Sequence, residues 1–293
     1  MLRFHVPSGI GDISWCYSKV VELAKKRQVG FYICGDNPRR SHPYVNILPG
    51  VTNLGYTKLS YVPHIEPNLL PPATTKLGEL ADGTYYLGLN PWLEKGHPLH
   101  EAFPDQPTDY HYKLHLPAPD TLPAVRMLRS LPQKKIGFYC SSNRHRNGLG
   151  MWSVQQWVEF LKLVGGMYPG CVFVALGAPY DAKTLQVADV LARDNPVYRF
   201  LNQPPCQSFR IMETFSYFFA FPSGLGIMAD VMRVPCMMWF WGNLPEWQNR
   251  MGGLFTAYAD PETLASGQHI VAPYDTVEAA FKLFSEKGAR HVR

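Results

Sequence analysis

The stretch YFFAFPSGLGIMADVMRVPCMMWFW, residues 217–241, decides the fold class of this chain. An apolar run at 217–221 is followed by the turn PSGLG, by a helix-like segment at 227–232 and by a second apolar run at 236–241. Short apolar runs bounded by Gly and Pro are typical of buried strands. The stretch therefore predicts a strand–helix–strand unit, which is the repeating element of a parallel sheet.

The same alternation extends through both halves of the chain. Strands are predicted at 2–6, 29–34, 45–48 and 85–89 in the first half, and at 135–140, 171–176, 217–221 and 236–241 in the second. Helices are predicted at 13–26, 181–191 and 227–232. We therefore expect an α/β protein.

Capping residues predict the start of two more helices. Ser153 and Gln156 have the spacing of a capping box, in which each side chain bonds the backbone N–H of the other residue. Asp275 and Glu278 have the same spacing near the end of the chain. A helix is therefore expected after each pair.

Length and composition indicate two globular domains. At 293 residues the chain exceeds the usual span of one hydrophobic core. Hydrophobic residues make up 46% and charged residues 17%, which is ordinary for a protein with large buried sheets and excludes a disordered chain. A linker is predicted at 131–133, which gives two Rossmann-like domains, 1–131 and 132–293.

The charge balance favours an anionic partner. The formal net charge is +5 and the isoelectric point is about 8.8. A nucleotide diphosphate, an anionic glycan and nucleic acid all fit this balance, and the excess is too small to choose among them.

The cysteines and the hydropathy predict a cytoplasmic protein without a membrane span. The cysteines are widely spaced in the sequence and form no CxxC pair. We therefore predict that they are reduced, buried thiols. They are Cys16, Cys34, Cys140, Cys171, Cys206 and Cys236. No apolar stretch approaches the roughly twenty residues that span a bilayer. If a phage encodes the chain, the compartment would be the host cytoplasm.

The turn PSGIGD, residues 7–12, follows the first predicted strand. Open α/β sheets bind their ligands at the carboxyl ends of strands, and glycine allows close approach of the backbone to a ligand. Gly9 and Gly11 are therefore candidate acceptor contacts, and Asp12 is a candidate general base for an acceptor hydroxyl. The alternative is that Asp12 only caps the following helix.

The second half of the chain holds the candidate contacts to an anionic donor. The turn PSGLG presents backbone N–H groups at a predicted helix start, which is a phosphate-binding arrangement. The loop SSNRHRNGLG, residues 141–150, adds arginines, which bind pyrophosphate through paired hydrogen bonds. The candidate donor contacts are Ser142, Arg144, Arg146, Gly177, Ser223, Gly224, Leu225 and Gly226.

Motifs of other chemistries are absent from the sequence. It contains no HExxH, P-loop or GxSxG motif, no DxD triplet and no clustered Cys/His spacing. The dinucleotide fingerprint GxGxxG is incomplete, because Ser14 stands in place of its third glycine. We therefore expect no metal and no cofactor, and a redox enzyme is the weaker interpretation.

These stretches resemble the heptosyltransferase-like family of glycosyltransferases. The resemblance lies in PSGIGD, in KIGFYCSSNRHRNGLGMWSVQQWVEFLKLV, in CVFVALGAPYD and above all in SGLGIMADVMRVPCMMWFWG. It implies the GT-B fold, in which two Rossmann-like domains face a central cleft. It also implies a nucleotide-sugar donor in the C-terminal domain and no metal.

The resemblance assigns roles to individual residues. Asp12 matches the catalytic base of the family and Gly11 the glycine before it, while Ser223 and Gly224 match the turn that contacts the donor. The family often has Asp and His where this chain has Pro222 and Ile227. For this reason the resemblance does not assign ADP-heptose as the donor.

The acceptor is left open between two classes. The family resemblance implies a saccharide or glycan, whereas the basic balance and an aromatic-rich acceptor half also suit DNA with 5-hydroxymethylpyrimidine bases, as phages modify it. Candidate acceptor contacts lie in the Pro- and His-rich region 90–119. They are Trp92, Glu94, His97 and His100. A third alternative is an inactive GT-B-like binding protein.

Overall fold

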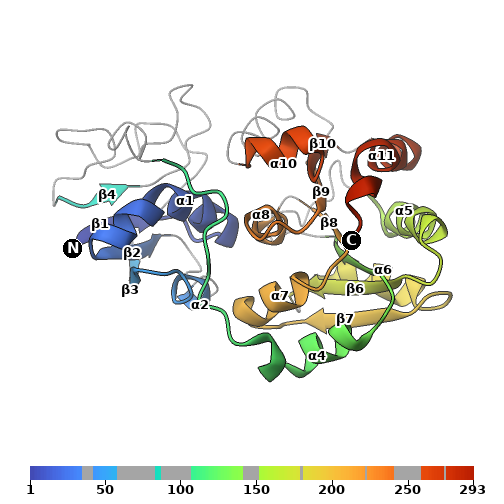
Figure 1. Cartoon of the computed structure of the whole chain (residues 1–293), viewed down its shortest axis with the longest axis horizontal. Coiled ribbons are helices and arrows are strands. Elements are labelled where there is room, and N and C mark those ends of the chain that lie inside the picture. The colour runs from blue at the N-terminus through green and yellow to red at the C-terminus, as the bar shows by residue number, and fades with distance from the viewer. Residues whose placement is uncertain are drawn as a thin grey trace. The chain divides into compact units, whose positions relative to one another are not determined.

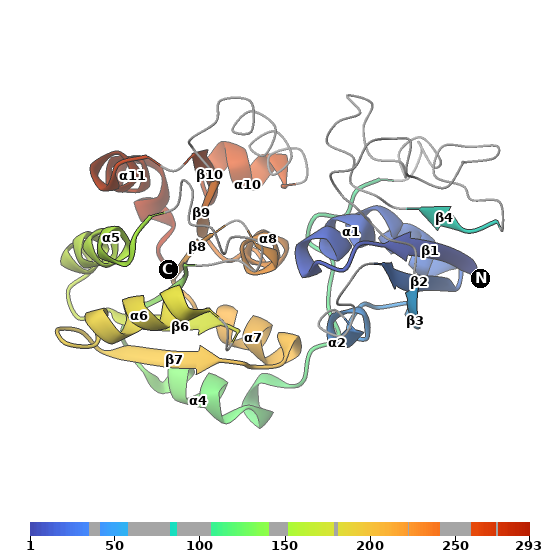
Figure 2. The same cartoon turned by 180° about the vertical axis from the view of Figure 1, so that it is seen from behind.

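The structure is a computed structural model, and it describes nine ranges of the chain. These are 1–34, 42–57, 83–86, 107–140, 152–178, 181–221, 223–240, 259–273 and 275–293. The chain divides into two compact units, Met1–Leu116 and Pro117–Arg293. Helices and strands of the first unit are blue to cyan, and those of the second are green to red (Figures 1 and 2).

The second unit begins earlier than the sequence predicted. Helix α4 (Pro123–Ser130) lies before the predicted linker at 131–133, yet it packs against α7 (Pro205–Met212) of the second unit. The Nε atom of Arg210 on α7 also donates a hydrogen bond to the carbonyl of Pro117, at 2.8 Å. These contacts fasten the segment that begins at Pro117 to the second unit.

Within its described residues, the first unit contains a parallel four-stranded sheet in the order β3-β2-β1-β4. Its elements are β1 (Leu2–Val6), α1 (Ile10–Lys26), β2 (Val29–Cys34), α2 (His42–Val45), β3 (Val51–Thr57) and β4 (Tyr85–Tyr86). This is the strand order of the first half of a Rossmann fold. Packing of α1 on the sheet includes an edge-to-face contact between Tyr17 and Phe31, with ring centroids 6.5 Å apart.

One predicted strand of this unit is wrong. Residues 45–48 form the end of α2 and the turn after it, and the strand begins only at Val51. Tyr44, Val45 and Leu48 are all buried, so that the apolar run reflects one buried face of a short helical turn. Short apolar runs do not distinguish a strand from such a turn.

The second unit is a parallel six-stranded sheet in the order β10-β9-β8-β5-β6-β7. Its strands are β5 (Lys135–Tyr139), β6 (Val172–Gly177), β7 (Val197–Leu201), β8 (Tyr217–Ala220), β9 (Cys236–Phe240) and β10 (His269–Pro273). Counted from β5 as the first strand, this is the complete Rossmann order 3-2-1-4-5-6. The direction of winding reverses between β5 and β8.

The helices of the second unit partly confirm the predictions. They include α5 (Val154–Met167), α6 (Ala182–Leu191), α8 (Gly224–Val231), α10 (Pro261–Ser266) and α11 (Val277–Leu283). The capping box of Ser153 and Gln156 is present at the start of α5, as predicted. At α11 the predicted cap is wrong, because the hydroxyl of Thr276, one residue after Asp275, accepts the hydrogen bond from the N–H of Ala279.

The core of the second unit is built from aromatic side chains. Trp157 and Trp239 are fully buried, with ring centroids 5.2 Å apart at an interplanar angle of 86°. Phe160 and Phe219 pack edge to face beside them at 4.9 Å. Rings of this size dominate core energetics, so that the cluster fixes α5 against the centre of the sheet.

All six cysteines are free thiols, and five of them are buried. Among the described residues, no helix is both long and apolar enough to cross a membrane. Within the same ranges, no three His, Cys, Asp or Glu side chains come together as metal ligands would.

Gly137 on β5 should tolerate no side chain. A Cβ atom there would lie 2.2 Å from the ring of Phe215, so Gly137→Ala should destabilise the protein by about 1–3 kcal/mol through overpacking. Gly166 in α5 is the matched control, because a Cβ there meets nothing within 4 Å. Gly166→Ala should stabilise by about 0.5–1 kcal/mol, since alanine favours helix. Urea unfolding of both variants measures this, and equal effects would contradict the packing argument.

His269 on β10 should make the protein sensitive to acid. Burial lowers its pKa below the ordinary value of 6.5, although Asp230 acts in the opposite direction. The unfolded chain then binds a proton that the native state does not, so the free energy of unfolding should fall as the pH drops below about 6.5. In His269→Asn this fall should be smaller, measured by urea unfolding at pH 7.5 and 5.5. His115→Asn, at an exposed position, is the control, and an unchanged fall in His269→Asn would refute the assignment.

Candidate functional site

Strand order defines one candidate site in each unit. Where the winding of a doubly wound sheet reverses, the crossover segments diverge and leave a crevice at the carboxyl ends of the strands. In the first unit this point lies between β1 and β4, and in the second between β5 and β8. The segment after β1 leads to Asp12, and the segment after β8 leads to Ser223.

Asp12 lies in the first turn of α1 and is not the N-cap residue. The N-cap residue is Gly9, and Asp12 is the third residue of the helix. The helix has no side-chain hydrogen bond at its cap. The carboxylate is partly exposed and folds back over Gly9, where an added Cβ would lie 2.5 Å from Oδ2 of Asp12. Gly9 therefore makes room for the carboxylate, a role that the sequence did not indicate.

Buried hydroxyl groups support the first turns of α1. The hydroxyl of Ser14 lies 2.7 Å from that of Tyr44, which lies 2.8 Å from that of Tyr112. The oxygen of Ser14 also donates to the carbonyl of Ile10. Burial raises the pKa of both tyrosines, so they remain neutral donors and acceptors. The chain of hydroxyls ties α1 to α2 and to the segment around Tyr112.

The face of α1 that carries Asp12 continues into the core. Cys16, one turn further on, is fully buried, and its pKa is raised by burial first and by the negative charge of Asp12 second. The carboxylate therefore borders an apolar interior on one side, although it is partly exposed on the other. A carboxylate in such a setting suits proton transfer.

In the second unit, α8 begins directly after Ser223. Ser223 is the N-cap residue, and its Oγ accepts a hydrogen bond from the N–H of Gly226 at 3.5 Å. Ser223, Gly224 and Leu225 are partly exposed, whereas Gly226 is buried. A Cβ at Gly226 would lie 2.6 Å from Sδ of Met238, so this glycine lets α8 pack closely on the sheet. The exposed end of the turn is thus formed by 223–225.

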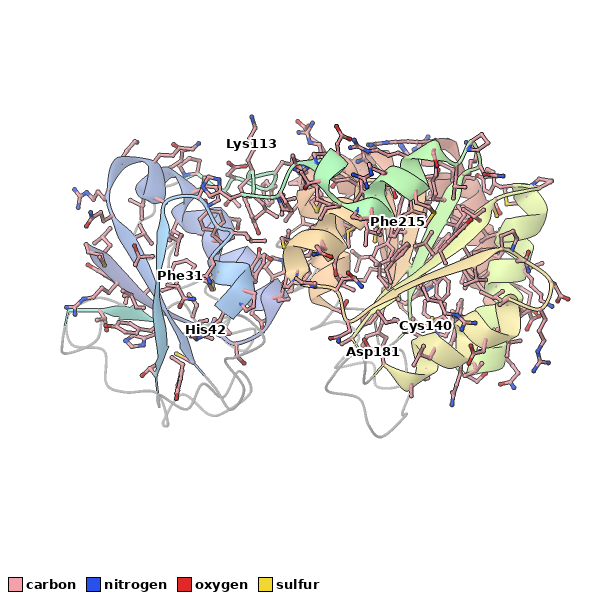
Figure 3. The ribbon with its side chains drawn as sticks, turned by 90° about the horizontal axis from the view of Figure 1, so that it is seen from below. Phe31, His42, Lys113, Cys140, Asp181 and Phe215 are labelled. Atoms are coloured by element: carbon pink, nitrogen blue, oxygen red, sulfur yellow. The ribbon has the colours of Figure 1, made fainter. Side chains whose placement is uncertain are left out.

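Gly177 ends β6, and the structure requires glycine at this position for two reasons. Its φ angle is +156°, and a Cβ there would lie 2.8 Å from Oδ2 of Asp181. Asp181 is buried, and its Oδ2 accepts from the N–H of Ala178 at 2.6 Å. Its Oδ1 accepts from the hydroxyl of Tyr139 on β5 at 3.3 Å. Asp181 thereby joins the ends of two neighbouring strands. Figure 3 labels Asp181 close to Cys140, the residue after β5.

Several predicted contacts lie outside the described residues. On the donor side these are Ser142, Arg144 and Arg146, and on the acceptor side Trp92, Glu94, His97 and His100. Gly11 is described and buried in the first turn of α1. The structure therefore brings Gly9, Gly11 and Asp12 together in the first unit, and Ser223–Gly226 at the start of α8 in the second.

The sequence did not indicate the polar groups at the start of α6. Thr184 is fully buried, and its hydroxyl accepts a hydrogen bond from the N–H of Cys140 at 3.1 Å. Lys183 donates from Nζ to the carbonyl of Trp152 at 3.0 Å. A signal was available, because the run YDAKT directly after a predicted strand places three polar side chains in one helical turn.

Comparison with solved structures gives the fold. No protein-family model and no curated protein matches the chain. It aligns over 99% of its length with 98% of the ADP-heptose lipopolysaccharide heptosyltransferase II of E. coli, with TM-score 0.65 and 12% identity. It also aligns over 99% of its length with 93% of a family 9 glycosyltransferase of Veillonella parvula DSM 2008, with TM-score 0.59 and 14% identity.

A third similar structure is named for a different reaction. A protein named as a UDP-N-acetylglucosamine 2-epimerase, from Listeria monocytogenes, covers all of this chain with 90% of its own, with TM-score 0.57 and 10% identity. Identities this low are evidence of a shared fold alone. The chain therefore has the GT-B fold, built from two Rossmann-like domains, as predicted.

The fit between Gly9 and Asp12 should appear as an energetic coupling. Gly9→Ala should destabilise the protein by about 1 kcal/mol or more, because the new Cβ meets the carboxylate at 2.5 Å. In an Asp12→Ala background this cost should largely vanish, since the clashing oxygen is gone. A double-mutant cycle of urea unfolding measures the coupling. Equal costs in both backgrounds would show that Gly9 is required for another reason.

Proposed function

We propose that this protein is a glycosyltransferase that moves a sugar from a nucleotide-sugar donor to an acceptor hydroxyl. The proposal rests most on Asp12, a carboxylate at the switch point of the first sheet for which Gly9 leaves space. In the fold class of this chain, function must be argued from such a site and not from the fold.

Asp12 is proposed as the general base. It would accept the proton of the acceptor hydroxyl while that oxygen attacks the anomeric carbon of the donor sugar and the bond to the diphosphate breaks. Its position in the first turn of α1 suits this role, because the partial positive charge of the helix start stabilises a carboxylate. The base would thus be ionised and ready to accept a proton.

The donor is proposed to bind the second unit. The first N–H groups of a helix have no acceptor within the helix, and those of α8 follow the partly exposed Ser223. They would stabilise the leaving diphosphate in the absence of a metal. Ser223, Gly224 and Leu225 are the proposed contacts, whereas Gly226 contributes through packing. Gly177 would contribute to donor binding indirectly, because it leaves space for the carboxylate of Asp181.

A saccharide is the proposed acceptor, and the cytoplasm the proposed location. Two of the similar structures are named as sugar transferases and one as an epimerase, and the partly exposed carboxylate of Asp12 favours transfer to a hydroxyl. Hydroxymethylated DNA and an inactive binding protein are outcomes that the following experiment distinguishes.

A nucleotide-release assay tests the proposal. UDP-, ADP- and GDP-sugars are each incubated with saccharide acceptors, with DNA that contains 5-hydroxymethylpyrimidines, or with no acceptor. Release that depends on a saccharide is expected. Release only with modified DNA would show that the acceptor is DNA and not a saccharide. Conversion of the sugar without any acceptor would indicate an epimerase. Donor binding without release in any mixture would indicate an inactive binding protein.

Asp12→Asn should separate catalysis from binding. The amide keeps the shape of the carboxylate but cannot accept the proton, so turnover should fall about 100-fold or more while the Kd of the donor stays within about 3-fold. Asp120→Asn, at an exposed carboxylate near Arg129, is the matched control and should keep full turnover. Unchanged turnover in Asp12→Asn would refute the assignment of the base.

A further inference from the structure

Lys183 stands at the carboxyl edge of the second sheet, beside the strand at which the winding reverses. It is the second residue of α6, which begins where β6 ends. Its Nζ donates to the carbonyl of Trp152, the residue before the cap of α5. It also acts electrostatically on Cys140, which directly follows β5. The ammonium group therefore lies near the ends of both β5 and β6.

The charge of Lys183 has no ion-pair partner among the described residues. The carbonyl of Trp152 takes one of its three N–H donors. Two other lysines of this unit have acids, since Lys162 pairs with Asp194 at 2.7 Å and Lys282 with Glu286 at 3.9 Å, whereas Lys135 donates only to a carbonyl, as Lys183 does. The loops that follow β5 and β6, 141–151 and 179–180, contain no Asp or Glu in the sequence.

Asp181 and Cys140, two acidic groups close to Lys183, are both buried. The carboxylate of Asp181 is buried and accepts hydrogen bonds from the N–H of Ala178 and the hydroxyl of Tyr139. The thiol of Cys140 is fully buried, and burial raises its pKa well above the ordinary value, so that it stays neutral. Within the described ranges, the partly buried ammonium group of Lys183 therefore has no anionic partner.

Partial burial of such a cation is unfavourable without a ligand. Burial lowers the pKa of Lys183, which is the expected response of an ammonium group that loses water and gains no carboxylate. An anionic ligand at this edge would compensate the positive charge of Lys183. Its oxygens would accept hydrogen bonds from the two remaining N–H groups.

We propose that Lys183 binds a phosphate group of the nucleotide at the carboxyl edge of the second sheet. The inference rests on the proposed function for the presence of a nucleotide in this unit. It adds a cation from α6 to the contacts proposed for the start of α8. Lys183 thereby recognises the phosphate part of the ligand and not its base.

Calorimetric titration with nucleotides tests the proposal. UDP, ADP and GDP are titrated into the full chain, each beside its nucleoside, which lacks phosphate. Lys183→Met should weaken binding of the diphosphate that the wild type prefers by about 10-fold or more, the effect of one charge-assisted hydrogen bond. The affinity for the nucleoside should change less than about 2-fold. Lys183→Arg should retain most of the affinity, because it keeps the positive charge.

The controls distinguish a direct contact between Lys183 and phosphate from a purely structural role of Lys183. Lys162→Met removes an exposed lysine of α5 and should leave all affinities unchanged. Thermal unfolding identifies variants that are not folded, and Lys183→Gln replaces Lys183→Met if the latter is unstable. Equal losses for nucleoside and diphosphate would mean that Lys183 only supports Trp152, which would overturn the proposal.

Failure of this proposal differs from failure of the proposed function. If the wild type binds a diphosphate and transfers sugar, but Lys183→Met binds equally well, only the role of Lys183 is refuted. If the wild type binds no nucleoside diphosphate at all, both proposals are refuted.

Discussion

A parallel sheet needs a crossover after each strand, and in both units the crossovers run outward in two directions from the first strand. The first strand is β1 in one unit and β5 in the other. At the edge where the two directions separate, no crossover covers the carboxyl ends of the central strands. The candidate groups among the described residues lie at or beside such an edge, where the fold leaves strand ends accessible to a ligand.

Close packing at these edges depends on glycine, for different reasons at different positions. Gly9 leaves space for the carboxylate of Asp12, and Gly177 does the same for Asp181. Gly226 instead lets α8 approach Met238 on β9. Two of the three glycines therefore accommodate a carboxylate from the following helix. Only the carboxylate of Asp12 remains partly exposed, which separates a candidate catalytic group from a structural one.

The two candidate sites differ in charge in the way that the proposed transfer reaction requires. The site of the first unit presents a carboxylate, which suits removal of a proton from a hydroxyl. The site of the second unit presents helix N–H groups and the ammonium group of Lys183, while its own acid, Asp181, is buried in hydrogen bonds. The N–H groups and the ammonium group make the electrostatic potential at this edge more positive. Such a potential suits an anionic donor and a leaving group that gains negative charge.

The sequence by itself determined the fold class and most of the strands. Alternating apolar runs and glycine turns report directly on burial and on local backbone freedom, so β1, β2, β5, β6, β8 and β9 were all predicted. The half-exposed β7 was missed, because no continuous apolar run marks it. The sequence also predicted that Asp12 and the 223–226 turn follow strands, and both do so in the structure.

Only the tertiary structure decided which groups meet across the sheet. Strand order brings the end of β5 next to that of β6, and so places Lys183 beside Cys140, which lies 43 positions earlier in the chain. The same holds for the chain of hydroxyls from Ser14 through Tyr44 to Tyr112. Such contacts leave no local pattern, because they depend on the pairing of distant segments, whereas periodicity and capping depend only on residues within a few positions of each other.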